Sequence, residues 1–136
     1  MSEPRAFISF DFDHDEDQKV LFAGQSKNSS TPFTIQDWSA KEAMAQSRWE
    51  AIVEDKMKRS NMVIVLVGKY MASATGVSKE IEMAVRNNVP MFGVYISGAN
   101  SLSNLPNGLA RNRVIGWTWD GISKAVAQMM NEGKNR

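Results

Sequence analysis

The stretch Met62-Val63-Ile64-Val65-Leu66-Val67 is an uninterrupted apolar run, and Gly68 and Lys69 follow it directly. Similar runs occur before and after it in the chain, at residues 5–10 and 90–96. Short apolar runs separated by helix-length segments are typical of parallel strands that are covered on both faces. Parallel sheets bind ligands outside the carboxyl ends of their strands. We therefore expect the functional residues where these runs end.

The segments between these runs predict an alternation of helices and strands. This pattern predicts an α/β fold with three layers, in which a flavodoxin-like, doubly wound sheet has five parallel strands in the order 2-1-3-4-5. That order puts the switch point of the sheet between the first and third strands. The further predicted elements are helix 15–24, strand 33–36, helix 43–59, a helix ending at 87–88, strand 113–117 and a final helix capped by Asp120.

Composition and charge restrict the class of protein. The chain has 136 residues, of which 43% are hydrophobic and 23% charged, so residues 1–136 are expected to form a single soluble domain. The net charge of +1 gives no electrostatic reason to expect a nucleic acid or a membrane surface as partner. Cysteine is absent, which excludes disulfides and thiolate chemistry. With no apolar signal segment at its start, the protein is expected in the cytoplasm.

An acidic segment follows the first predicted strand. Asp11, Asp13 and Asp15 could hold Mg²⁺, since hard cations prefer carboxylate oxygens. A solvated loop with an acidic helix start explains the same residues. A phospho-receiver domain would also need an aspartate at the end of the third strand, and residues 66–69 contain none. We therefore assign no metal site.

Glu80 lies early in the helix that follows residues 62–67. The apolar stripe of that helix is predicted to be Val77, Ile81, Ala84 and Val85. At about 100° per residue, Glu80 lies about 40° outside this stripe, and Glu82 lies slightly farther away on the other side. Periodicity alone therefore favours a solvated glutamate at both positions.

Two tryptophans have different predicted roles. Trp49 lies on the apolar stripe of helix 43–59, which predicts a core position. Trp38 follows the short strand 33–36, where its indole could stack on a nucleotide ring or pack at the sheet edge. The common glycine-rich nucleotide loops and the hydrolase and metalloprotease motifs are absent from the chain.

Several segments, in this order, resemble the TIR-like family, which includes small stand-alone bacterial and archaeal proteins and the TIR-like subunits of Thoeris antiphage defence. The resemblance covers roughly residues 4–130. The segments that carry it are 6–12, 33–39, 62–68, 77–81 and 90–96.

The resemblance implies a flavodoxin-like TIR fold and a signalling activity that cleaves the nicotinamide–ribose bond of NAD⁺. Glu80 matches the position of the catalytic glutamate in active members, and the products would be ADP-ribose or a cyclic isomer. NAD⁺ would be the substrate, and no cofactor is expected. The residues that would line the nucleotide pocket are Ser9, Phe10, Asp11, Asp37, Trp38 and Ser39.

The chain also departs from the family pattern. Many TIR enzymes carry a tryptophan shortly before the glutamate, where this chain has Thr75-Gly76-Val77. Lys79 could lower the pKa of Glu80, contact a phosphate or remain solvated. The alternative function is a non-catalytic TIR-type interaction module, with a homo-oligomer or a partner TIR or effector protein as its target. A receiver-like domain regulated without phosphorylation is a third interpretation.

Overall fold

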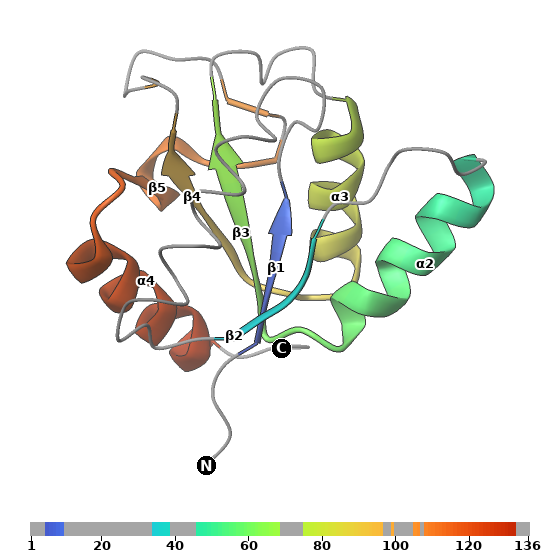
Figure 1. Ribbon diagram of the computed structural model, residues 1–136, viewed down its shortest axis with the longest axis horizontal. Helices are drawn as coiled ribbons and strands as arrows, with labels where there is room; N and C mark the ends of the chain where they lie inside the picture. The colour runs from blue at the N-terminus through green and yellow to red at the C-terminus, as the bar shows by residue number, and fades with distance from the viewer. Residues whose placement is uncertain are drawn as a thin grey trace.

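A parallel β-sheet forms the centre of the computed structural model, which describes residues 5–9, 34–38, 46–68, 75–96, 99, 105–106 and 108–132. The sheet order is β2-β1-β3-β4-β5, and each neighbouring pair is parallel (Figure 1). The predicted α/β class with a parallel sheet is confirmed. The strands are β1 (Arg5–Ser9), β2 (Thr34–Trp38), β3 (Met62–Val67), β4 (Met91–Tyr95) and the two-residue β5 (Val114–Ile115).

The strand β3 has the predicted bounds, and every one of its residues is buried. Its alternate side chains enter two separate hydrophobic clusters, one on each face of the sheet. Val63, Val65 and Val67 lie on one face, and Met62, Ile64 and Leu66 lie on the other. An apolar run without polar interruptions is what burial on both faces requires.

Helices cover both faces of the sheet. The helices α2 (Gln46–Lys58) and α3 (Thr75–Arg86) contribute to the cluster that contains Phe7 and Val65, whereas α4 (Trp119–Glu132) contributes to the cluster that contains Ile8 and Ile64. Figure 1 shows α2 and α3 on one side of the strands and α4 on the other. A short 3-10 helix, η2 (Arg111–Arg113), leads into β5.

Two predicted details are wrong. Asp37 and Trp38 belong to β2, where they pair with Phe7 and Ile8, rather than to a turn after a shorter strand. The register between β1 and β2 shifts between Ala6 and Phe7, and the pairing continues to Trp38. The cap of α4 is Thr118 rather than Asp120, because the Gly121 backbone N–H donates to Thr118 Oγ1 at 3.2 Å.

Of the other predicted elements, the end of α3 is confirmed and one helix lies outside the described residues. The turn at residues 87–88 ends α3 as predicted, and Asn88 adopts a positive φ of 57°, which is common where a helix ends. The predicted helix 15–24 lies outside the described residues. No helix in the described part of the chain has the length and apolar character needed to cross a membrane.

Gly108 lies against the buried face of α3, and its replacement tests this packing. Its φ is +93°, and a Cβ atom there would lie 2.7 Å from Ile81 Cγ2. We expect Gly108→Ala to lower the free energy of unfolding by about 1–3 kcal/mol, because alanine is strained at positive φ and the side chain of Ile81 must move. Urea denaturation measures the difference.

Gly116→Ala is the matched control for this substitution. A Cβ atom at Gly116 meets nothing within 4 Å, so we expect a change of less than about 0.5 kcal/mol. Equal stabilities for the two variants would contradict the described contact between Gly108 and Ile81.

Candidate functional site

The switch point of the sheet lies between β1 and β3. On one side of this point the sheet continues to β2, and on the other side to β4 and β5. The chain leaves the carboxyl end of β1 toward β2 and the carboxyl end of β3 toward β4, on opposite sides of this point, and this is where doubly wound sheets bind ligands. The chain that leaves β3 reaches α3, so the first turns of α3 follow this edge of the sheet. A side chain at the end of β1 can therefore meet one from the start of α3.

Ser9 is the last residue of β1, and the alternation of the strand decides which way its side chain points. Ala6 and Ile8 belong to the cluster beneath α4, whereas Phe7 belongs to the cluster beneath α2 and α3. Residues two apart in a strand share a face, so Ser9 lies on the same face as Phe7. That face is covered by α3. Ser9 itself is completely buried.

The buried face of α3 differs from the predicted stripe. Val85 is 61% exposed, so its predicted core position is wrong, while Glu80 is only 1% exposed. At about 100° per residue, Glu80 lies about 20° from the centre of the buried face, and Val85 lies beyond its margin. Among the α3 side chains that the structure describes, the buried ones are Val77, Glu80, Ile81, Met83 and Ala84.

Ser9 and Glu80 form a buried polar pair. Ser9 Oγ donates a hydrogen bond to Glu80 Oε1 at 2.5 Å, across 71 positions of the sequence. This distance is at the short end of the range for hydrogen bonds between two oxygen atoms. The Glu80 Oε2 atom is also shielded from solvent. The site therefore presents an oriented carboxylate at the switch point of the sheet.

The other predicted site residues are placed less completely. Asp37 and Trp38 lie in β2, directly beside β1, but their side chains are outside the described part of the structure. Phe10, Asp11 and Ser39 also lie outside it, as does the acidic segment after β1. Of the predicted set, Ser9 and Glu80 are the two that the described structure brings together.

Lys79 and Glu82 are directed away from this pair. Lys79 Nζ forms an ion pair with Glu50 Oε1 of α2 at 2.9 Å, so the lysine is engaged between the two helices. Glu82 is exposed, unlike Glu80. Helical periodicity alone placed the two glutamates almost equally, and the structure separates them by burial. The alternation of side chains along β1 was the signal that could have separated them, because it puts Ser9 on the face covered by α3.

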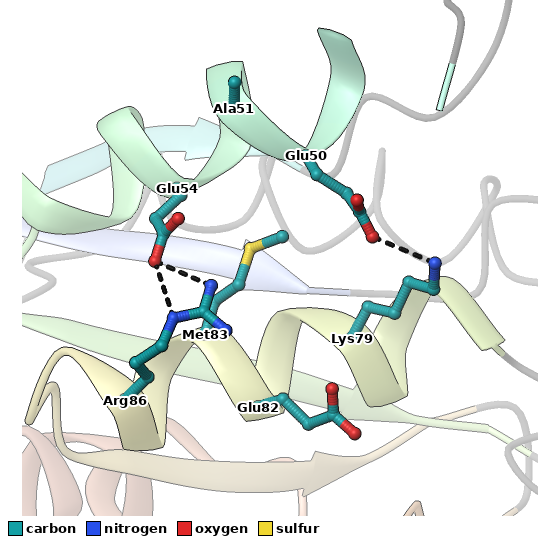
Figure 2. A pocket seen from close by; sticks show the side chains of 7 residues that line it. All are labelled: Glu50, Ala51, Glu54, Lys79, Glu82, Met83 and Arg86. Carbon is teal, nitrogen blue, oxygen red and sulfur yellow. Dashed lines mark hydrogen bonds and ion pairs between the residues drawn. The ribbon is translucent and has the colours of Figure 1, made fainter. Parts of the chain in front are cut away.

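A second feature is a groove of about 380 Å³ between α2 and α3. Figure 2 shows Glu54 and Arg86 reaching toward each other across it, and Glu50 and Lys79 doing the same nearer the start of α3. Glu80 does not line this groove. The lining residues are Glu50, Ala51, Glu54, Lys79, Glu82, Met83 and Arg86.

Glu54 accepts several hydrogen bonds in this groove. Three N–H groups converge on its Oε2 atom, from Asn87 Nδ2 at 2.8 Å, Arg86 Nη2 at 2.7 Å and Arg86 Nε at 3.1 Å. The hydrogen bond from Asn87, followed by that from Arg86, lowers the pKa of the Glu54 carboxyl below its ordinary value of 4.5. These contacts tie α2 to the end of α3. We expect these contacts to stabilise the packing of α2 against α3.

The comparisons with known proteins agree with this architecture. A family model described as the TIR-like domain of the Thoeris protein ThsB matches residues 7–101, and the chain belongs to this family. No curated protein matches the chain with significance.

Two solved structures are similar to the chain as a whole. The crystal structure of a prokaryotic SEFIR domain shares 14% identity and a TM-score of 0.54, and the alignment covers 96% of this chain and 92% of that one. At this identity the similarity supports the fold alone. A 3-dehydroquinate dehydratase-like protein from Bifidobacterium longum shares 14% identity over 96% of this chain and 97% of that one, with a TM-score of 0.46.

Glu54→Gln tests the contacts across the groove through their dependence on pH. Because the pKa of Glu54 is lowered in the folded state, its contribution to stability is complete above about pH 4.5 and is lost as the pH falls through the folded-state pKa. We expect the variant to be less stable than the wild type by about 0.5–1 kcal/mol at neutral pH. This difference should shrink in urea denaturation below pH 4.5.

Asp55→Asn is the control, since Asp55 lies next to Glu54 in α2 and pairs with Arg59 at the exposed surface. Exposed pairs of this spacing contribute about 0.3–0.5 kcal/mol. A Glu54→Gln difference that is the same at neutral pH and below pH 4.5 would contradict the role given to the carboxylate charge.

Proposed function

We propose that this TIR-like domain cleaves the nicotinamide–ribose bond of NAD⁺ in a signalling step of antiphage defence, with Glu80 as the catalytic carboxylate. The observation that carries the proposal is the difference between the two glutamates of α3. Glu80 is buried at the switch point and is oriented by Ser9, whereas Glu82 is exposed. Ionisable groups that are both buried and oriented are concentrated at functional sites. Membership of the TIR-like family supports the same assignment.

The chemistry of NAD⁺ cleavage suits a single carboxylate. When the bond between the ribose anomeric carbon and the nicotinamide nitrogen breaks, its electron pair neutralises the pyridinium ring, so nicotinamide leaves without a general acid. Positive charge develops on the anomeric carbon and ring oxygen of the ribose. A carboxylate close to that carbon stabilises the oxocarbenium-like transition state. Attack by water, with loss of a proton, then gives ADP-ribose, and attack by a nucleophile of the same molecule gives a cyclic isomer.

The burial of Glu80 implies a condition for this reaction. A carboxylate that is 1% exposed cannot contact a substrate until the surrounding structure changes. We therefore expect activity to depend on a change that opens the site, with assembly of copies of the chain or binding of a partner TIR or effector protein as its cause. The assay should use a high protein concentration and a crowding agent, which favour assembly.

The substitution Glu80→Gln tests the catalytic assignment. We expect NAD⁺ consumption to fall by at least about 100-fold, because the negative charge that stabilises the transition state is removed. The melting temperature should change little, because the glutamine Oε1 atom can still accept the hydrogen bond from Ser9. Mass spectrometry of the products distinguishes hydrolysis from cyclisation.

Glu82→Gln is the matched control, because it makes the same change of charge on the exposed side of the same helix. We expect its rate of NAD⁺ consumption to equal that of the wild type. Equal rates for Glu80→Gln and the wild type would remove the catalytic assignment. If none of the three proteins cleaves NAD⁺, the non-catalytic interaction module becomes the better interpretation.

A further inference from the structure

We propose that Ser9 is a positioning residue, which orients the Glu80 carboxylate for the reaction and does not contact the nucleotide. This inference rests on the proposed cleavage of NAD⁺. It replaces the expectation from sequence that Ser9 lines the nucleotide pocket. Two features of the structure support it, namely the hydrogen bond that the Ser9 hydroxyl donates to Glu80 and the strand and helix that hold the two residues.

The hydroxyl of Ser9 already donates a hydrogen bond to Glu80. A serine hydroxyl has one hydrogen to donate, and that of Ser9 goes to Glu80 Oε1 at 2.5 Å. A ligand could receive this hydrogen only if the bond to the carboxylate were broken. Ser9 is completely buried, as is Glu80, so both residues become accessible only when the site opens. With its hydrogen donated to the carboxylate, Ser9 is placed to act on the substrate through Glu80.

The two residues of this hydrogen bond belong to regular secondary structure, Ser9 to β1 and Glu80 to α3. Ser9 is held in the sheet, where β1 pairs with both β2 and β3, and Ser9 itself is paired with Val65. On the other side, the helix that carries Glu80 is anchored by the buried Val77, Ile81 and Ala84. A reactive group is held most accurately by rigid elements and by hydrogen bonds from supporting residues. The bond to Ser9 restricts the rotation of the carboxylate plane.

This role predicts a change in kcat without a change in KM. If Ser9 orients the carboxylate, its loss weakens an interaction made in the transition state, while the affinity for NAD⁺ is kept. If Ser9 instead contacted the nucleotide equally in the ground and transition states, its loss would raise KM and leave kcat unchanged. The two roles are therefore separated by steady-state kinetics.

The experiment measures NAD⁺ cleavage by the full chain for the wild type, Ser9→Ala and Ser9→Thr under conditions that promote assembly. For Ser9→Ala we expect kcat to fall by about 10- to 100-fold, with KM within about twofold of the wild type. Ser9→Thr keeps the hydroxyl and should recover most of kcat. Circular dichroism at the assay temperature shows whether each variant is folded.

Ser60→Ala is the matched control, because Ser60 is also a completely buried serine, and its hydroxyl bonds to the Lys56 carbonyl at 3.2 Å at the end of α2. Both kinetic constants should stay at the wild-type values. Ser9→Cys keeps the shape of the side chain, slightly enlarged, with a weaker donor, so an intermediate kcat supports the proposal even if Ser9→Ala does not fold.

A rise in KM with an unchanged kcat in Ser9→Ala would overturn the positioning role and make Ser9 a nucleotide contact. Wild-type values for both constants would overturn it as well. Neither result would affect the proposed function, which depends on cleavage by the wild type and its loss in Glu80→Gln. If the wild type itself does not cleave NAD⁺, both proposals fail together.

Discussion

The burial of β3 on both of its faces is the constraint on which the rest of the structure depends. A strand without polar side chains must be covered on each side, and it must have a neighbouring strand at each edge to satisfy its backbone groups. Here β1 and β4 are those neighbours, and α3 and α4 contribute to the clusters on opposite faces. The central position of β3 also brings the end of β1 next to the crossover into α3. The candidate site is a consequence of this arrangement.

The Ser9–Glu80 pair is a polar pair next to an otherwise apolar cluster. Burial of a carboxylate costs several kcal/mol, and a hydrogen bond to a charged group contributes about 1.5–3 kcal/mol. The bond from Ser9 therefore offsets part of that cost. Apolar residues of similar volume often stabilise a core as well as a buried polar pair does. Stability alone therefore does not require a polar pair at the switch point.

The buried and exposed sides of α3 make different contacts. Its buried side contributes the carboxylate and the apolar contacts that anchor it, whereas its exposed side forms ion pairs to α2 through Lys79 and Arg86. These ion pairs and the hydrogen bond from Asn87 to Glu54 connect α2 to α3. The helix that carries Glu80 therefore contacts the sheet on one side and α2 on the other.

The amino-acid sequence by itself determined the α/β class, the bounds of β3 and the end of α3, because buried strands and helix ends depend on local patterns of apolar, asparagine and proline residues. Its resemblance to the TIR-like family also singled out Glu80. The predicted stripe residues Val77, Ile81 and Ala84 are buried, but only the tertiary structure decided where the edges of the buried face of α3 lie. Helical periodicity leaves the edges of a stripe undetermined, and packing against β1 and β3 excluded Val85 and admitted Glu80. The pairing of Ser9 with Glu80 was likewise beyond the sequence, since it joins residues 71 positions apart through the order of the strands.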